Sequence, residues 1–234
     1  MHELTFAAAA LMLCVAAGSY LAGCCNGAII TSFLFYKDDI RKHGSHNAVI
    51  VSKYILRNDV RKHGSGNAGL TNFYRVYGGK FAVCVILVDM LKAFVAVKLG
   101  SVVFDAYLGL RLEGEYFSAL FCVIGHIFPA FYSFKGGKGI LCSGTLLLLL
   151  DWRIAAVGWG LFALLWLTTR YVSLGSISGA ASFPITTLIF CRSNWTVFVL
   201  SLLIAALVIW AHRENIGRLL HGTESRFRWH TDAP

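Results

Sequence analysis

The feature that most constrains this chain is a set of long segments without a single charged residue. Four of them, at residues 4–36, 116–134, 171–191 and 193–211, reach the roughly 17–25 residues that a helix needs to cross about 30 Å of hydrocarbon. The chain is 57% hydrophobic and 14% charged, whereas a soluble domain carries about 25% charged residues. These values exclude a water-soluble globular domain and an intrinsically disordered chain.

Three further apolar segments are interrupted or short. Residues 81–104 carry Asp89, Lys92 and Lys98, while residues 139–150 and 154–169 flank a predicted tight turn at Asp151-Trp152-Arg153. We therefore predict an all-α integral membrane protein with about seven transmembrane helices. The alternative joins the short pair into one re-entrant element and leaves six spans or fewer.

The first apolar run also contains Leu21-Ala22-Gly23-Cys24, which matches a lipoprotein cleavage box. Cleavage there would remove the segment before Cys24. A secretory signal normally begins with basic residues, but Met1-His2-Glu3 holds neither Lys nor Arg, and the run continues for 12 residues beyond Cys24. We therefore interpret the segment as a retained span.

The positive charge is distributed unevenly between the predicted connections. Residues 37–80 hold nine Lys or Arg against three Asp or Glu, whereas residues 105–115 hold one Arg and three acids. With seven spans, 16 Lys and Arg fall on the side of the first basic loop and three on the other. The positive-inside rule then places the N-terminus outside and the C-terminus in the cytoplasm. The net charge of +9 needs no nucleic acid partner.

A ten-residue segment occurs twice with a period of 20, at residues 39–48 and 59–68. We interpret the chain as a single domain, residues 1–234, with a local duplication in its cytoplasmic loop at 37–68; two anion sites are the alternative. The second copy keeps Gly66, where the first has His46. A backbone that approaches an anion closely favours Gly, so the second copy is the candidate for the working one.

Two glycine-rich motifs are candidates for binding anions. Residues 63–72 combine three glycines with the hydroxyls of Ser65 and Thr71, and Arg75 follows; this set could form a backbone cradle with a bidentate cation, or simply a turn. The second motif is Phe134-Lys135-Gly136-Gly137-Lys138-Gly139, directly before a predicted helix at Ile140. Flexible backbone and cations at a helix N-terminus favour phosphate, although a basic turn at the membrane boundary has the same composition.

The remaining polar residues give weaker signals. Asp89 and Lys92, three apart in one span, predict a buried ion pair, and together with the intramembrane His126 they would serve a small transporter or anion channel. A third class is a non-catalytic protein whose basic loop binds phospholipid headgroups. The seven cysteines lack metal-ligand spacing, so we expect no metal and no cofactor. No H-x-x-x-x-D, H-E-x-x-H, G-x-S-x-G or C-x-x-C pattern occurs, which disfavours CoA-type acyltransferase, zinc, α/β-hydrolase and redox-pair chemistry.

Taken together, three motifs resemble those of the bacterial acyl-phosphate-dependent glycerol-3-phosphate acyltransferases of the PlsY type. They are G-S-G-N-A-G-L-T-N at 64–72, G-H-I-F-P with F-K-G-G-K-G at 125–139, and H-R-E-N-I with R-L-L-x-G-T-E at 212–224. The resemblance implies a seven-helix enzyme of the bacterial inner membrane that transfers an acyl group from acyl phosphate to the 1-hydroxyl of sn-glycerol 3-phosphate. The products would be lysophosphatidic acid and phosphate, and the partners membrane lipid and an acyl-phosphate-producing enzyme.

The resemblance also implies roles for individual residues. The catalytic residues would be Ser65, Arg75, His212 and Asn215. The residues binding substrate and phosphate would be Gly64, Gly66, Asn67, Thr71, Asn72, His126, Lys135, Gly136, Gly137, Lys138, Ser173 and Ser176. Glu224, Asp89 and Lys92 would be structural. The extra copy at 39–48 departs from the family pattern before the first motif.

Overall fold

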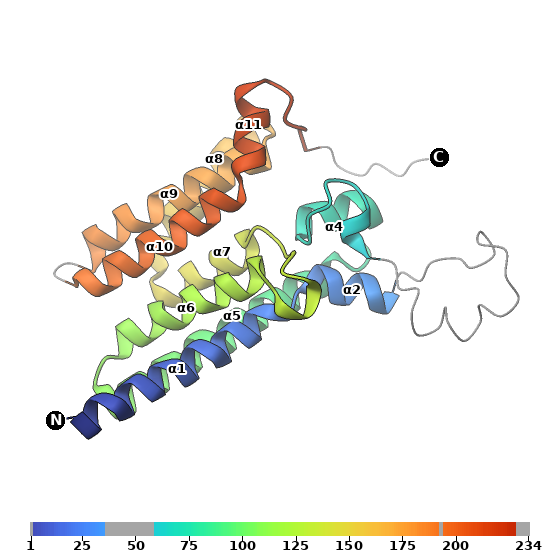
Figure 1. The fold of residues 1–234 in the computed structure, drawn as a ribbon. Helices are drawn as coiled ribbons and strands as arrows, with labels where there is room; N and C mark the ends of the chain where they lie inside the picture. The colour runs from blue at the N-terminus through green and yellow to red at the C-terminus, as the bar shows by residue number, and fades with distance from the viewer. Residues whose placement is uncertain (1, 36–58, 192–193, 228–234) are drawn as a thin grey trace, which may run out of the picture.

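The computed structural model describes residues 2–35, 59–191 and 194–227 (Figure 1). The first repeat copy, with Ser45, lies outside the described residues, so the duplication at 37–68 and the single-domain assignment stay predictions. Within the described ranges the secondary structure consists of α-helices and short 3₁₀-helices.

The long helices follow the apolar runs. They are α1 (His2–Cys24), α5 (Ala82–Leu108), α6 (Arg111–Ile127), α7 (Ile140–Leu150), α8 (Trp152–Thr169), α9 (Val172–Phe190) and α10 (Trp195–Ala211). The short elements are α2 (Gly27–Phe35), α4 (Leu70–Tyr77), α11 (Arg213–Leu220) and the 3₁₀-helices η2 (Val60–Lys62) and η3 (Ala130–Tyr132).

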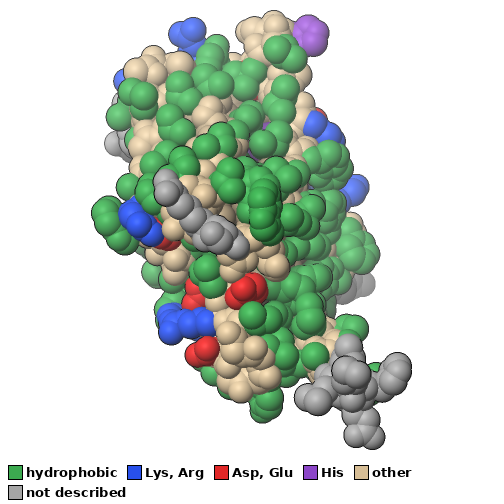
Figure 2. Space-filling view, turned by 90° about the vertical axis from the view of Figure 1, so that its left-hand side faces the viewer, with side chains coloured by type: hydrophobic (Ala, Val, Ile, Leu, Met, Phe, Trp, Pro, Cys, Tyr) green, Lys and Arg blue, Asp and Glu red, His purple; other side chains and the backbone are tan. Residues whose placement is uncertain are grey.

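The outer surface of the bundle is suited to lipid. Large apolar side chains such as Phe6, Leu13 and Val102 are 78%, 71% and 65% exposed, and hydrophobic side chains cover most of the face shown in Figure 2. Four described helices are long and apolar enough to cross a membrane, and a fifth crosses if α10 and α11, bent by 58°, are taken together. The protein is therefore an integral membrane protein that is helical throughout the described ranges.

The helices pack in two groups. Helices α1, α5, α6 and α7 lie together, helices α8, α9 and α10 form the other group, and α10 joins them by packing on α6 (Figure 1). The stacked rings of Tyr116 and Phe183, 5.8 Å apart, lie in the core between the groups. Helices α4 and α11 lie at the same end of this bundle, and the polar motifs gather there.

Helices α1 and α6 cross at unusually short range because two glycines meet at the crossing. A methyl group on Gly23 would overlap the backbone of Cys122, and one on Gly125 would overlap the backbone of Tyr20. Small residues allow such close helix contacts in membranes, where packing rather than water exclusion holds helices together. This crossing fixes the position of His126, the next residue in α6.

The first apolar run, interpreted from the sequence as one span, forms two helices in the structure. It breaks at Cys25 and Asn26, between α1 and α2. The Oδ1 atom of Asn26 accepts a hydrogen bond from the backbone N–H of Ile29 at 3.0 Å and so caps α2, while its Nδ2 donates to the carbonyl of Ala68 at 3.0 Å. The break therefore depends on a distant loop.

The connection predicted at 105–115 is shorter in the structure, because most of these residues are helical. Helix α5 continues to Leu108 and α6 begins at Arg111, so that only Gly109 and Leu110 separate them. Gly109 adopts a φ of 67° and ends α5 in a left-handed turn that favours glycine. In contrast, α7 and α8 are two separate helices, as expected, and Asp151 caps α8 by accepting a hydrogen bond from the N–H of Arg153.

Candidate active site

A cleft of about 560 Å³ opens at the end of the bundle that carries α4 and α11. Side chains from both helix groups and from the two glycine-rich loops line it. Fourteen of the residues singled out from the sequence belong to this lining: Gly64, Ser65, Asn67, Thr71, Asn72, Arg75, Asp89, His126, Lys138, Ser173, Ser176, His212, Asn215 and Glu224. The fold thus brings together segments up to 160 residues apart, from Gly64 to Glu224.

The loop before α4 is organised by a single buried amide. The Nδ2 group of Asn72 donates to the carbonyls of Val60, His63 and Asn67 at 3.0–3.2 Å, and its Oδ1 accepts from the N–H of Ser65 at 2.8 Å. Both N–H groups of the amide are therefore used inside the loop. Asn72 shapes the loop, which leaves the exposed hydroxyl of Ser65 and the exposed Arg75 to face the cleft.

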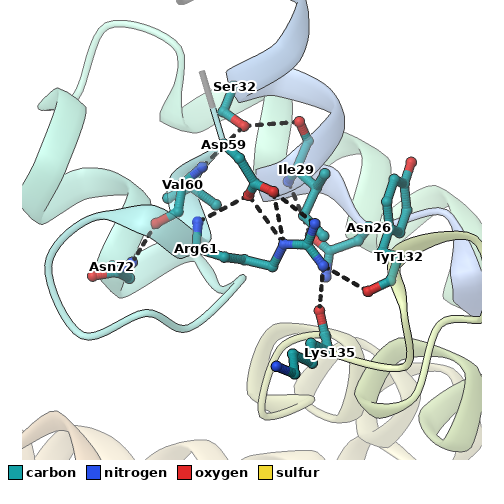
Figure 3. A network of polar contacts seen from close by, with 9 residues as sticks. All are labelled: Asn26, Ile29, Ser32, Asp59, Val60, Arg61, Asn72, Tyr132 and Lys135. Carbon is teal, nitrogen blue, oxygen red and sulfur yellow. Dashed lines mark hydrogen bonds and ion pairs between the residues drawn. The ribbon is translucent and has the colours of Figure 1, made fainter. Parts of the chain in front are cut away.

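Arg61 connects this loop to the second glycine-rich loop (Figure 3). Its guanidinium pairs with Asp59 at 2.6–3.0 Å and donates to the carbonyls of Tyr132 at 2.6 Å and Lys135 at 3.1 Å. The hydrogen bonds from Arg61 hold the pKa of the Asp59 carboxyl below its ordinary value, although burial acts in the opposite direction. The sequence interpretation had not assigned a role to Arg61; its only signal was the repeated Asp-x-Arg.

The loop between α6 and α7 is held by backbone contacts. The N–H groups of Gly136 and Gly137 donate to the carbonyls of Ile127 and His126, both at 3.1 Å, and the N–H of Ala68 donates to Gly136 at 3.4 Å. Gly139 adopts a φ of 81° directly before α7. This left-handed conformation, which favours glycine, turns the chain so that Lys138 faces the cleft.

Lys138 belongs to a polar network at the opposite wall. Its ammonium donates to the Oδ1 of Asn215, and the amide of Asn215 donates to Glu224 at 2.8 Å. Glu224 also accepts from Ser173 at 2.8 Å and pairs with Arg218 at 2.7 Å. Glu224 thus links α9, α11 and the segment after α11.

In this network the pKa values of Lys138 and Glu224 both lie below their ordinary values. Burial, reinforced by the positive charge of Arg218, lowers the pKa of Lys138 below its ordinary value. Burial acts to raise the pKa of Glu224, but hydrogen bonds from Asn215, Arg218 and Ser173 outweigh it and hold the pKa below the ordinary value. At neutral pH the carboxylate of Glu224 is therefore ionised and fully engaged.

His212 lies at the bend between α10 and α11 and is 3% exposed. Its Nδ1 lies 2.7 Å from the carbonyl of Val208, and because a carbonyl only accepts, Nδ1 carries the proton and Nε2 keeps its lone pair. Burial lowers the pKa of His212 to about 4, which the hydrogen bond to Val208 only partly offsets. The imidazole is therefore neutral at pH 7 and able to accept a proton.

A further polar cluster forms where the side chains of Asp89, Lys92 and His126 contact one another. The ammonium of Lys92 lies 2.8 Å from Asp89 and 2.6 Å from the Nδ1 of His126. The predicted ion pair is thus present, and its charges are paired within the bundle.

Some expected site residues do not line the cleft. The side chain of Lys135 is exposed on the loop, and Gly66, Gly136, Gly137 and Lys92 are likewise absent from the lining. The lining also includes residues to which the sequence interpretation gave no role, among them Arg218, Trp159 and Phe162. Arg218 was detectable as part of the R-L-L-x-G-T-E motif, whereas Trp159 and Phe162 are typical residues of a membrane helix and gave no signal.

An apolar groove adjoins the cleft. It is lined by residues of α7, α8, α9 and α10, and it shares Ile140, Trp159, Phe162 and Ser176 with the cleft. An apolar chain in this groove would reach the cationic cleft at its head. The fold and site together define an integral membrane protein whose site suits an anionic group joined to an apolar chain.

Comparisons with known proteins identify the family. The sequence model of the glycerol-3-phosphate acyltransferase family matches residues 47–222. Glycerol-3-phosphate acyltransferases of Finegoldia magna and Thermoanaerobacter pseudethanolicus are 39% and 38% identical, over 88% and 92% of this chain and 91% and 94% of theirs. The glycerol 3-phosphate form of PlsY (YgiH), an integral membrane glycerol 3-phosphate acyltransferase, superposes with a TM-score of 0.72 at 30% identity, covering 93% of this chain and 96% of that one.

The chain therefore belongs to the glycerol-3-phosphate acyltransferase family and is an enzyme of acyl transfer. The transporter and lipid-binding alternatives are replaced by this assignment.

Proposed function

We propose that the chain transfers a fatty acyl group from acyl phosphate to the 1-hydroxyl of sn-glycerol 3-phosphate, giving lysophosphatidic acid and inorganic phosphate. One observation carries the proposal: a cleft with Arg75, Lys138 and Arg218 in its lining continues into an apolar groove. Both substrates carry phosphate, and only the donor carries a long apolar chain. A related PlsY structure was determined in a lysophosphatidic acid form, and it superposes on this chain with a TM-score of 0.67.

The cationic and glycine-rich walls of the cleft would hold the two phosphates. Ser65, Thr71 and Arg75 lie on one wall, and Lys138 lies at the N-terminus of α7 on the other. Positive charge and free backbone N–H groups at a helix N-terminus stabilise phosphate. Acyl phosphate has a good leaving group, so positioning and charge stabilisation supply most of what catalysis requires.

In the transfer step, the 1-hydroxyl oxygen of glycerol 3-phosphate attacks the acyl carbonyl carbon. The new ester C–O bond forms, the bond from the carbonyl carbon to the phosphate oxygen breaks, and inorganic phosphate leaves with the bonding electrons. The hydroxyl proton passes to the Nε2 of His212 or to a substrate phosphate. The lone pair on Nε2 and the lowered pKa of His212 support the first acceptor.

One assay tests the reaction. Purified protein is incubated with radiolabelled glycerol 3-phosphate and either palmitoyl phosphate or palmitoyl-CoA, and lysophosphatidic acid is quantified. We expect product from palmitoyl phosphate alone. Product from palmitoyl-CoA would refute the choice of donor, and no product from either would refute the proposed function.

Direct transfer requires no acyl-enzyme. Single-turnover labelling with radiolabelled palmitoyl phosphate, quenched in acid, should leave no radioactivity covalently bound to protein. Label that forms on the protein and is released by glycerol 3-phosphate would refute direct transfer.

We also propose that seven helices, α1 and α5 to α10, cross a bacterial inner membrane with the N-terminus outside. The 16-to-3 distribution of Lys and Arg supports this orientation. A C-terminal green fluorescent protein fusion should then fluoresce and a C-terminal alkaline phosphatase fusion should be inactive; the reverse pattern would overturn it. On this topology the cleft faces the cytoplasm, where an acyl-phosphate-producing enzyme would deliver the donor.

A further inference from the structure

Inside the bundle, oxygen and nitrogen acceptors surround the ammonium group of Lys92. Its ammonium lies 2.8 Å from Asp89 Oδ1, 2.6 Å from His126 Nδ1 and 3.0 Å from the carbonyl of Cys25, with the carbonyl of Gly23 at 3.3 Å. Lys92, Asp89 and His126 are 5%, 1% and 2% exposed. The lysine therefore joins the break between α1 and α2 to α5 and α6.

This contact determines which nitrogen of His126 carries a proton. A lysine ammonium has three donors and no acceptor, so the Nδ1 of His126 must offer its lone pair. The other nitrogen, Nε2, then carries the hydrogen of the neutral ring. The Oδ1 atom of Asp89 lies 2.8 Å from the Lys92 ammonium and 3.8 Å from the Nδ1 of His126, so a carboxylate pairs with the ammonium beside the ring.

The Nε2 atom lies between the two glycine-rich loops. A methyl group on Gly137 would overlap Nε2 and would lie 2.7 Å from the carbonyl of Ala68. His126 lines the cleft, and its Nε2 has no hydrogen-bond partner among the described residues. Because Nδ1 faces Lys92, the Nε2–H is the remaining polar group of the ring, and it can donate to an acceptor supplied from the cleft.

We propose that Lys92 and Asp89 are positioning residues that lock His126 in its Nε2–H tautomer, and that this N–H donates to a phosphate oxygen of a substrate held between the two loops. The inference rests on the proposed function and deepens it. The cleft would then use its two histidines in opposite ways, because His212 keeps a lone pair on Nε2 and His126 a hydrogen. A neutral donor orients the phosphate without adding a further charge beside the buried ion pair.

Two substitutions separate the proposed role from a purely structural one. In His126→Asn, the side-chain oxygen can still accept from Lys92, but the donor toward the cleft is lost. In His126→Gln, an amide N–H reaches about the position of Nε2. We expect His126→Asn to raise one KM by about 10- to 100-fold, the range for a hydrogen bond to a charged group, and His126→Gln to stay within about threefold of wild type on that hydrogen-bond scale.

The two substrates are distinguished by measuring each KM separately. A rise confined to glycerol 3-phosphate or to palmitoyl phosphate identifies whose phosphate meets His126. A His126→Asn variant with wild-type values for both would overturn the proposal, and so would equal losses in both variants at unchanged thermal stability. Wild-type protein that makes no lysophosphatidic acid would instead contradict the proposed function.

A second measurement does not depend on activity. Nitrogen-15 NMR of histidine-labelled wild-type protein reports the protonation of each ring nitrogen, and the His126 signals are those that are absent from the spectra of both variants. We expect an unprotonated Nδ1 and a protonated Nε2 at pH 7. A protonated Nδ1 would overturn the proposal whatever the kinetics show.

Discussion

Gly136 offers a quantitative test of how the second glycine-rich loop is built. An added methyl group would overlap the carbonyl of His126 and would lie 2.7 Å from Pro129 Cδ and 2.9 Å from the carbonyl of Ile127. Two of these three neighbours are backbone atoms, which cannot rotate away as a flexible side chain would. The Gly136→Ala substitution must therefore displace the loop.

Displacing the loop would break the hydrogen bonds that hold it. The N–H groups of Gly136 and Gly137 donate to carbonyls at the end of α6 at 3.1 Å, and the N–H of Ala68 donates to the carbonyl of Gly136 at 3.4 Å. Three such bonds at about 1 kcal/mol each give about 3 kcal/mol, or about 150-fold in binding. Because the loop positions Lys138, we expect Gly136→Ala to raise the KM for glycerol 3-phosphate by about 10- to 150-fold and to lower kcat less.

The matched control is Gly160→Ala in α8, where an added methyl group meets nothing within 4 Å. This variant should keep wild-type kinetics and gain about 0.8–1.0 kcal/mol of helix stability. The assay is the initial rate of lysophosphatidic acid formation across a range of glycerol 3-phosphate concentrations, with thermal unfolding as the check on folding. An unchanged KM in a folded Gly136→Ala protein would refute the argument. A loss confined to kcat would show that the loop stabilises the transition state and not the bound substrate.

Three further predictions concern the loop repeat, the link between the loops and the acidic network. Ser65→Ala should abolish turnover while Ser45→Ala, in the first repeat copy, is nearly silent; equal losses in an acyltransferase assay would contradict the choice of the second copy. Arg61→Lys loses the planar guanidinium, which pairs with Asp59 through Nε and Nη2 while Nη1 donates to the carbonyls of Tyr132 and Lys135, so hydrogen exchange at residues 132–137 should accelerate and the KM for glycerol 3-phosphate should rise about tenfold; unchanged exchange would count against a connecting role. The stabilisation from Glu224, whose folded pKa lies below the ordinary 4.5, is present above pH 4.5 and is lost as the pH falls through the folded value. The difference in unfolding temperature between wild type and Glu224→Gln should therefore shrink to zero in acid, and a difference that persists there would exclude the carboxylate as its source.

Membrane insertion was predictable because it depends on the length and composition of continuous segments. Helices α9 and α10 therefore agree with their apolar runs to within a few residues. Breaks between helices were harder to predict where they depend on residues far away in the sequence. Asn26 interrupts the first run because it caps α2 and bonds to Ala68, and nothing near Asn26 in the sequence announces a loop 42 residues away.

The candidate site was likewise predictable only in part. Its motifs were visible because glycines, hydroxyls and cations stand close together in the sequence, and most of the residues they supplied line one cleft. The direction of individual side chains was not visible. Lys135 and Lys138 are three residues apart and equally basic, yet only Lys138 lines the cleft, because Gly139 turns the chain between the loop and α7.

By itself, the sequence predicted a helical membrane protein whose candidate anion-binding motifs lie on one side of the membrane. Hydrophobic length and charge distribution act locally, so they can be read without knowing the fold. Only the tertiary structure decided that Arg61 joins the two loops and that Lys92 takes the lone pair of His126. Hydrogen bonds depend on direction and on distances of about 3 Å, and residues far apart in the chain come that close only after the helices have packed.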